Sequence, residues 1–496
     1  MRKMLAVRRP SGAVLRRVLG LVILGGCMVG PNYQTPETEF SSQFAENDEN
    51  LGSEADLKEW WMQFNDPILN EMIDEAIVNN YDLRIATERI AQVRAQYQFA
   101  SDNLWPEINL NGTTIRQRIS QNIFNNSFNR IAFNQTNVPT RLNGPAVQDL
   151  FIIGFDASWE LDLFGHLRRL KESAFYELEA SWENFRNIYI TLLADVATNY
   201  ANLRSYQQLV SNIWDQIEVN QQELGLSESR FDAGLRSEIE PLQRKARLDF
   251  LSASLPPLEA EIRQSLYSLA VLLGKQPEEI PEKWLDPLPI PQANGKIPIG
   301  LPSDLLRRRP DIRLAERKLA SATALIGAAI AELFPSFSLT GSFGFESIQS
   351  SNWFTKKSQF WSIGPSMFWP AIDFGRIRDR IDYQNAYQRE TLLIYEKTIL
   401  QALQDVESTL AAYTKEETRL NRLAAQISDL SQSRDLTAAL YRAGLSSLSD
   451  LLAAEEQVLE AQQTYILSQQ TLSTDLMAVY KSLGGEWGGN QCSNTP

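Results

Sequence analysis

The sequence predicts a protein of mixed α and β structure in which one structural unit occurs twice. Two observations lead to this prediction: a repeat that stays in register over most of the chain, and two long stretches, 166–233 and 376–443, that contain no proline. A helix over either stretch would be about 100 Å long. No compact domain needs such a helix, so we expect an elongated assembly rather than a globular core.

The repeat becomes visible when the chain is aligned with itself. Segment 82–86 (DLRIA) resembles 311–315 (DIRLA). The matched positions that follow are Trp105 with Phe334 at an offset of 229, and Trp159 with Trp369, Phe164 with Phe374 and Gly165 with Gly375 at an offset of 210. Between the copies, 277–302 contains seven prolines, which exclude a continuous helix. Each copy is therefore predicted to run helix, strand, strand, very long helix, turn, helix.

The N-terminus predicts export. Cationic residues precede a short apolar run, 18–24, that cannot span a bilayer and is typical of a signal peptide. Small residues lead directly to Cys27, where a lipoprotein signal peptidase can cut and leave Cys27 for acylation. Met28 rather than Asp follows, which predicts sorting to the outer membrane. An ordinary signal peptide with a chance cysteine is the alternative. Acylation of Cys27 would leave Cys492, the other cysteine, without an intramolecular partner.

The long helices carry the pattern of a coiled coil, because apolar side chains recur at steps of three and four. In the first stretch these are Tyr189, Leu193, Val196, Tyr200, Leu203, Val210, Trp214, Ile217, Leu224 and Phe231. The second stretch repeats the arrangement. We therefore expect the long helices of both halves to pack side by side.

The strand segments alternate apolar and polar residues, as in 336–345 and 153–161. A soluble sandwich would alternate in the same way. Strands of about ten residues and an aromatic apolar face, beside an acyl anchor, favour a transmembrane barrel. Two hairpins supply four strands, whereas closed outer-membrane barrels need about eight or more. Several copies of the chain must then share one barrel, with their helices forming a hollow cylinder beneath it.

The composition argues against catalysis, cofactors and nucleic acid. A net charge of −14 disfavours nucleic-acid binding. His166 is the single histidine, and with two distant cysteines it cannot build a typical zinc or copper site. We interpret His166 as a solvated residue at the start of the long helix. No phosphate-binding glycine loop or hydrolase motif occurs, so we expect neither an enzyme nor a cofactor.

These features together resemble the outer-membrane factor family of tripartite efflux systems, the TolC-like channels, and especially their lipoprotein, NodT-type branch. The motifs that carry the resemblance are GPNYQTP at 30–36 after Cys27, Trp60-Trp61 with Phe64 and Asp66-Pro67, RFDAG at 230–234, YRAG at 441–444 and RRPD at 308–311. The resemblance implies a homotrimer with a 12-stranded outer-membrane barrel and a long periplasmic α-helical barrel. It also implies two partners, a periplasmic adaptor protein and an inner-membrane pump, often of the resistance-nodulation-division type.

The expected organisation combines the repeat with this resemblance. The segments are a signal peptide (1–26), an acylated segment of an equatorial belt (27–59), repeat 1 (60–276, with a hairpin at about 105–163), a proline-rich belt linker (277–302), repeat 2 (303–484, with a hairpin at about 334–373) and a tail (485–496).

The turns that end the two long helices are the candidate functional site. We expect them to face the adaptor and pump, and to reverse the chain at glycines with positive φ. The turn residues are Ala233, Gly234, Leu235, Ala443, Gly444 and Leu445. By the resemblance, Glu240 and Tyr441 would link neighbouring helices and hold the periplasmic gate shut, and Asp450 would help to ring the pore. Alternatively, Ser237 with Glu240 and Ser447 with Asp450 form capping boxes that start the returning helices.

Three other functions remain open from sequence alone. Within the channel class, an exit duct for type I protein secretion is the alternative to efflux. A periplasmic tether would also use an acylated cysteine and long helices, but it has no use for two alternating hairpins. A periplasmic enzyme is the third alternative, but the sequence contains no catalytic motif that favours it. The cargo is not encoded in any motif, and copper, silver, dyes and antibiotics are all compatible with a resistance channel.

Overall fold

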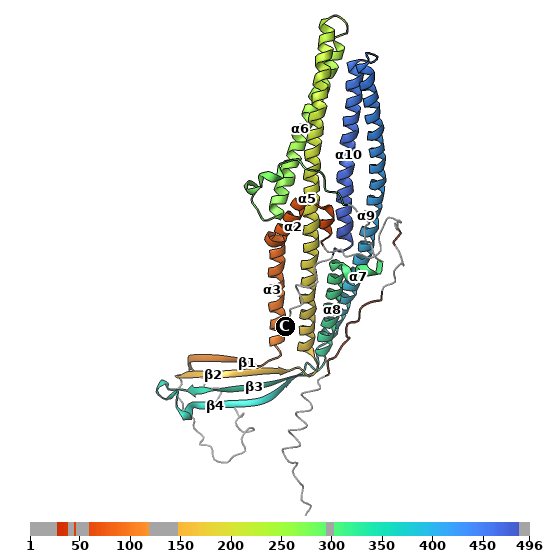
Figure 1. The fold of residues 1–496 in the computed structure, drawn as a ribbon. Helices are drawn as coiled ribbons and strands as arrows, with labels where there is room; N and C mark the ends of the chain where they lie inside the picture. The colour runs from red at the N-terminus through yellow and green to blue at the C-terminus, as the bar shows by residue number, and fades with distance from the viewer. Residues whose placement is uncertain (1–26, 38–43, 46–58, 119–146, 294–301, 486–496) are drawn as a thin grey trace, which may run out of the picture. The chain divides into compact units, whose positions relative to one another are not determined.

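The computed structural model describes residues 27–37, 44–45, 59–118, 147–293 and 302–485 (Figure 1). The predicted signal peptide, Cys492, nearly all of the predicted tail and most of the long connection in the first hairpin lie outside these residues. The chain divides into two compact units. One unit holds the four strands and contains 93–177 and 319–391, and the other contains 178–318 and 392 to the C-terminus.

The main elements of both repeats follow the same order: helix, strand, strand, very long helix, returning helix. Repeat 1 consists of η1 (Trp60–Phe64), α2 (Pro67–Asn79), α3 (Tyr81–Asp102), β1 (Glu107–Arg118), β2 (Val147–Leu161), α5 (His166–Asp232) and α6 (Ile239–Leu272). Short 3-10 turns η3 (Pro277–Glu279), η4 (Glu282–Trp284) and η5 (Pro302–Asp304) occupy the linker. Repeat 2 consists of α7 (Leu305–Arg308), α8 (Pro310–Ala331), β3 (Ser336–Ser347), η6 (Ser350–Asn352), η7 (Lys356–Ser358), β4 (Gln359–Phe368), α9 (Arg376–Arg442) and α10 (Leu448–Ser482).

The long helices follow the proline-free stretches. Helices α5 and α9 each have 67 residues, and both stop at the turn glycines. Among the described residues, no helix is both long enough and apolar enough to cross a membrane.

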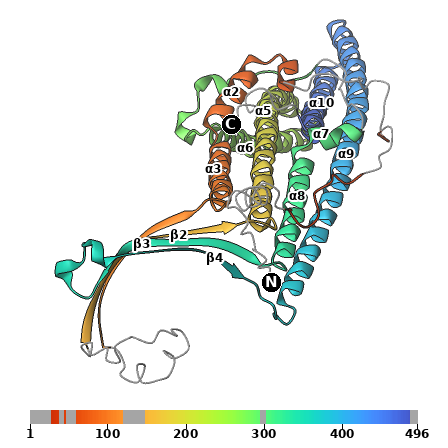
Figure 2. The same cartoon turned by 90° about the horizontal axis from the view of Figure 1, so that it is seen from below.

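The strands form one antiparallel sheet in the order β1-β2-β3-β4, and they lie side by side in both views (Figures 1 and 2). The central pairing, β2 with β3, joins the two repeats and places Phe155 opposite Phe343 and Gly154 opposite Gly344. A side chain at Gly344 would collide with the Ile153 carbonyl oxygen, so this close approach of the two strands requires glycine. Strands β1 and β4 are the two outer strands of the sheet.

In the second unit, α5 packs against α6 through Ile213, Ile217, Leu251 and Leu255. Of the predicted seam, Ile217 lies in this contact and Val210 packs against it, whereas Trp214 is 54% exposed in a single chain. A helix has 3.6 residues per turn, so the stripe that faces α6 within the chain passes through Ile213 rather than Trp214.

The proline-rich linker is fastened to α5 by a buried arginine. The Arg204 guanidinium donates to the Trp284 carbonyl at 3.2 Å and to the Asp286 carbonyl at 2.8 Å. The Gln207 amide donates to the Trp284 carbonyl as well, at 3.0 Å. Proline-rich backbone makes few hydrogen bonds of its own, so these donors satisfy carbonyls that would otherwise be buried unpaired.

Candidate functional site

Both long helices end in the same backbone motif. After α5, the Leu235 amide donates to the Arg230 carbonyl at 2.9 Å and the Gly234 amide to the Phe231 carbonyl at 2.8 Å. After α9, the corresponding bonds start from Leu445 and Gly444, at 2.9 and 3.0 Å. This pair of bonds is the Schellman motif, which needs a residue with positive φ. Gly234 and Gly444 have φ values of 73° and 72°, which confirms the prediction made for them.

Each turn presents one bare leucine. Leu235 is 73% exposed and Leu445 is 76% exposed. In a Schellman motif the residue after the glycine commonly packs back on its own helix. Here both leucines remain open to solvent, so the two turns offer matching apolar contacts to another molecule.

Asp450 forms the predicted capping box with Ser447. The Asp450 amide donates to the Ser447 hydroxyl at 3.2 Å, and the Ser447 amide donates to the Asp450 carboxylate at 2.9 Å. Hydrogen bonds from the Ser447 hydroxyl and amide, and from the Ser446 hydroxyl, hold the pKa of the Asp450 carboxyl below its ordinary value of 3.8. The cap is therefore a charged carboxylate at the N-terminus of α10, where the helix dipole favours it.

The capping box predicted for Ser237 with Glu240 in the first turn does not form, so that prediction is wrong. The Ser237 hydroxyl accepts from the Ile239 amide at 3.4 Å, and the Glu240 amide donates to the Ser237 backbone carbonyl at 3.3 Å rather than to the hydroxyl, so the reciprocal pair of a capping box is absent from this described stretch. Glu240 instead faces two guanidinium groups, Arg236 at 3.8 Å and Arg230 at 4.0 Å. Two nearby cations attract the carboxylate more strongly than a single amide does, which explains why the same spacing gives a different contact.

Tyr441 lies three residues before the second glycine and is 40% exposed. Within the described residues of one chain, its hydroxyl has no hydrogen-bond partner. It is therefore available for a bond to another copy of the chain.

A charge cluster that the sequence analysis missed lies further along the returning helices. It consists of Glu223 on α5, Arg244 and Arg247 on α6, and Glu456 and Glu460 on α10. Arg247 donates to Glu456 at 2.8 Å, Arg244 approaches Glu456 at 3.5 Å, and further ion pairs join Arg244 to Glu223 and Arg247 to Glu460. The signal in the sequence was two arginines three apart and two glutamates four apart, each pair on one helix face.

This charge cluster borders a pocket of about 620 Å³ that is also lined by Glu240. Burial raises the pKa of the Glu223 carboxyl above its ordinary value of 4.5, and the Arg244 charge opposes this shift. The cluster ties the returning helix of repeat 1 to the returning helix of repeat 2, close to the turns.

The segment after Cys27 is anchored at the junction of β2 and α5. The Val29 amide donates to the Phe164 carbonyl at 3.1 Å, and Arg169 donates to the Val29 and Gly30 carbonyls at 3.1 and 3.2 Å. Cys27 itself is exposed. This part of the predicted 27–59 segment therefore packs in the unit that carries the strands, with the thiol accessible.

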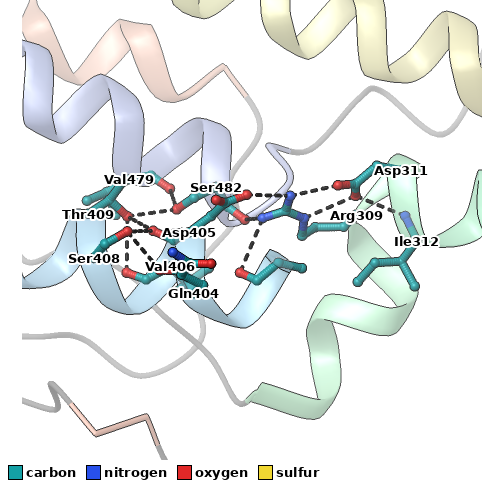
Figure 3. Close-up of polar contacts among 11 residues, drawn as sticks. Arg309, Asp311, Ile312, Gln404, Asp405, Val406, Ser408, Thr409, Val479 and Ser482 are labelled. Carbon is teal, nitrogen blue, oxygen red and sulfur yellow. Dashed lines mark hydrogen bonds and ion pairs between the residues drawn. The ribbon is translucent and has the colours of Figure 1, made fainter. Parts of the chain in front are cut away.

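The RRPD segment at 308–311 has a structural role (Figure 3). Arg309 is buried, pairs with Asp311 at 2.7 Å and Asp405 at 3.1 Å, and donates to the Ser482 carbonyl at 2.9 Å. Figure 3 shows the guanidinium between the start of α8 and the two helices α9 and α10. One side chain thus joins three helices of repeat 2.

His166 is partly buried rather than fully solvated. Its Nδ1 lies 3.0 Å from the Ala328 carbonyl, which links α5 to α8. Among the described residues, no group of three or more His, Cys, Asp or Glu side chains could hold a metal ion.

Comparisons with known proteins decide the family. The model of the outer membrane efflux protein family matches residues 72–275 and 301–485, one match in each repeat. The chain belongs to this family. A probable efflux pump outer membrane protein, TtgC of Pseudomonas putida, is 32% identical over 474 residues, which cover 94% of each chain. Nodulation protein T of Rhizobium leguminosarum bv. trifolii is 29% identical over 444 residues, 88% of this chain and 90% of the relative.

Solved structures of outer membrane efflux proteins agree with this assignment. The outer-membrane channel OprN is 32% identical and superposes with a TM-score of 0.81, covering 93% of this chain and all of that one. The predicted family, the TolC-like fold and the function as an outer-membrane component of an efflux system are confirmed. The family assignment also agrees with the expectation that the chain is not an enzyme.

Proposed function

We propose that three copies of this chain close one barrel and form the exit duct of a tripartite efflux system. Substrates pass through it passively, delivered by an inner-membrane pump of the resistance-nodulation-division type and a periplasmic adaptor. The observation that carries this proposal is the four-stranded sheet with β1 and β4 as its outer strands. Exposed outer strands pair readily, and three such sheets supply the roughly twelve strands that a barrel of this kind needs.

Mass measured in detergent tests the assembly. We expect three times the protomer mass, together with a stable conductance when the purified protein is added to planar bilayers. A monodisperse monomer that keeps its strand content would contradict the proposed duct.

The two turns are proposed as the adaptor-facing surface. Supporting this, both turns have the same backbone geometry, and each presents a leucine about three-quarters exposed, Leu235 and Leu445. Burial of exposed apolar side chains drives protein association, so a partner that covers both leucines would be stabilised. The double variant Leu235→Asp with Leu445→Asp should keep the trimer and its conductance but lose adaptor binding in pull-down. Retained binding would remove the turns from the interface.

The gate is proposed at Glu240, Tyr441 and Asp450. Glu240 faces cations rather than capping a helix, and Tyr441 has a hydroxyl available to another copy, so both fit links between neighbouring helices. Asp450 fulfils a capping role in addition to any role in ringing the pore. Purified trimers carrying Tyr441→Phe with Glu240→Ala should conduct more than wild type. Unchanged conductance in an intact trimer would exclude these two side chains from the gate.

Acylation, including palmitate, is proposed at Cys27. Its support is the exposed thiol and the anchoring of the next residues beside the strands, which would hold a lipid near the membrane. Intact-mass measurement should give a mature chain that begins with lipidated Cys27. The variant Cys27→Ser should impair sorting to the outer membrane more than folding, whereas a different mature N-terminus would refute lipid attachment.

The cargo is proposed to be small organic molecules rather than secreted protein. Two relatives from Pseudomonas putida have names that specify a substrate: a toluene efflux pump outer membrane protein and an antibiotic efflux pump outer membrane protein. A deletion strain should become more sensitive to solvents, dyes or antibiotics and recover on complementation. Normal tolerance with a missing extracellular protein would favour type I secretion instead.

A further inference from the structure

Within one chain, an aromatic stack joins the two repeats where strands meet helices. Phe164, between β2 and α5, stacks on Phe334, between α8 and β3, with ring centroids 4.6 Å apart and planes 16° apart. The last strand of repeat 1 meets the first strand of repeat 2 at this position. Stacking of this kind contributes beyond the area that it buries.

The repeat assigns an equivalent to each ring. At an offset of 210, Phe164 corresponds to Phe374, and at an offset of 229, Phe334 corresponds to Trp105. The hydrogen bonds beside them correspond as well. The Trp159 indole donates to the Leu104 carbonyl at 2.9 Å, and the equivalent Trp369 indole donates to the Leu333 carbonyl at 3.1 Å.

The equivalent rings are bare in a single chain. Phe374 is 90% exposed and Trp105 is 71% exposed. Phe374 also has a φ of 56°, the left-handed conformation that is unfavourable for a bulky residue. Within the chain, the Asp373 carboxylate accepts from the Gly375 and Ile377 amides at 3.1 and 2.9 Å and holds this turn, whereas the Phe374 ring itself stays exposed.

The helix beside Trp105 shows the same contrast. Residues 322–331 of α8 are buried at eight of ten positions. The equivalent stretch of α3, 93–102, has no buried residue. Phe99, the equivalent of buried Ala328, is 69% exposed. The end of α3, which leads into β1, is therefore exposed, whereas the equivalent end of α8, which leads into β3, is buried.

We propose that Phe374 of one protomer stacks on Trp105 of the next and reproduces between chains the contact of Phe164 with Phe334. The inference rests on the proposed trimer. It identifies the occupant of the bare surface as a second copy of this chain, since the internal contact already shows which ring fits against which. Three such stacks would ring the base of the barrel.

The same operation fixes the register of β4 on β1 of the next copy. Strand β2 pairs with β3 so that Asp156 lies opposite Ser342. The offset of 210 takes Asp156 to Ser366, and the offset of 229 takes Ser342 back to Thr113. Ser366 of one copy should therefore lie opposite Thr113 of the next. A slip by one residue would turn every side chain to the other face of the sheet, so this register is specific.

A double-mutant cycle tests the stack. Labelled and unlabelled trimers are mixed in detergent, and the rate of subunit exchange is measured for Trp105→Ala, for Phe374→Ala and for both together. A subunit that dissociates from the trimer breaks two interfaces, so each single variant should exchange subunits roughly ten times faster than wild type. The double variant should exchange little faster than the more affected single variant, since each change removes the same contact.

Matched variants separate this pair from aromatic surface in general. Phe354, between η6 and η7 and outside the strands, is 66% exposed, close to the 71% of Trp105. Phe354→Ala should change exchange far less, and the swap Trp105→Phe with Phe374→Trp should restore the wild-type rate. Equal acceleration by Phe354→Ala, or additive effects of the two single variants, would overturn the stack.

Cysteine pairs test the register. In a Cys492→Ser background, Ser366→Cys with Thr113→Cys should give covalent trimers under mild oxidation, whereas Ser366→Cys with Thr114→Cys should not. The reverse pattern would overturn the register. A wild-type protein that is monomeric would contradict the proposed function as well, whereas a stable wild-type trimer indifferent to both ring substitutions would overturn the stack alone.

Discussion

Removal of one charge from the cluster behind the turns should bias the channel toward its open state. Glu456 on α10 receives Arg247 at 2.8 Å and Arg244 at 3.5 Å, both from α6. If opening moves the helix pair of repeat 2 away from that of repeat 1, these ion pairs must break. Glu456→Gln keeps the shape of the side chain and deletes its charge.

The expected magnitude follows from burial. A hydrogen bond to a charged group contributes about 1.5–3 kcal/mol when buried, and an exposed ion pair about 0.2–1 kcal/mol. The three side chains are 17–28% exposed, so about 1 kcal/mol for each of two contacts is reasonable. Loss of the Glu456 charge also relieves its repulsion of Glu223, which offsets part of this. A net change of about 1.4 kcal/mol corresponds to a roughly tenfold higher open-to-closed ratio for each protomer.

Planar-bilayer recording of purified trimers measures this ratio directly. Glu455→Gln is the matched control, because it makes the same chemical change one residue away, where the described residues place no ion pair. The difference between the two variants should shrink in about 1 M salt, which screens charges that are partly exposed. Equal conductance of Glu456→Gln and Glu455→Gln at low salt, with both trimers intact, would refute the role of the cluster in holding the channel closed.

Three further substitutions test single structural roles. Arg309→Met should lower the unfolding temperature by several degrees in a thermal melt, because about 3 kcal/mol of charged hydrogen bonding is lost, and Arg309→Lys should recover only part of it. The Glu223 pKa is raised, so the folded state binds more protons than the unfolded state above pH 4.5; the stability of wild type relative to Glu223→Gln should therefore fall as pH rises through that window, and a pH-independent difference in denaturant midpoint would contradict this. Gly444→Ala should destabilise by about 1 kcal/mol through its positive φ alone, since a side chain there meets nothing within 4 Å, whereas Gly225→Ala, inside α5 near its C-terminal end, should stabilise.

Sequence patterns predicted the fold because they depend on local rules. Alternation gave the strands, the absence of proline gave the long helices, and the glycines at 234 and 444 gave turns with positive φ. Each of these features is decided within a few residues, and the repeat doubled every observation. The family resemblance used the same local motifs.

Contacts between distant helices could not be predicted in the same way. Ser237 and Ser447 each stand three residues before an acid, yet only Ser447 forms a capping box, because Arg230 and Arg236 attract Glu240. Arg247 and Glu456 are separated by 209 residues. Their pairing depends on how far α6 and α10 slide along each other, and a heptad pattern fixes which face meets but not the axial position.

In a protein built of two repeats, a position that is exposed while its equivalent in the other repeat is covered marks a surface that another copy of the chain can cover. Between the two repeats, β2 pairs with β3 and Phe164 covers Phe334. At the outer edges, β4 and β1 pair with no further strand of the described residues on their outer sides, and their junction residues Phe374 and Trp105 are exposed. A substitution at the inner contact should therefore change the stability of the folded chain at any protein concentration. An equivalent substitution at the outer edges should change assembly, with an effect that grows as the protein is diluted, because only association depends on concentration. The inner pair, Phe164 with Phe334, and the outer pair, Phe374 with Trp105, can therefore be assigned to folding and to assembly by the concentration dependence of their effects alone.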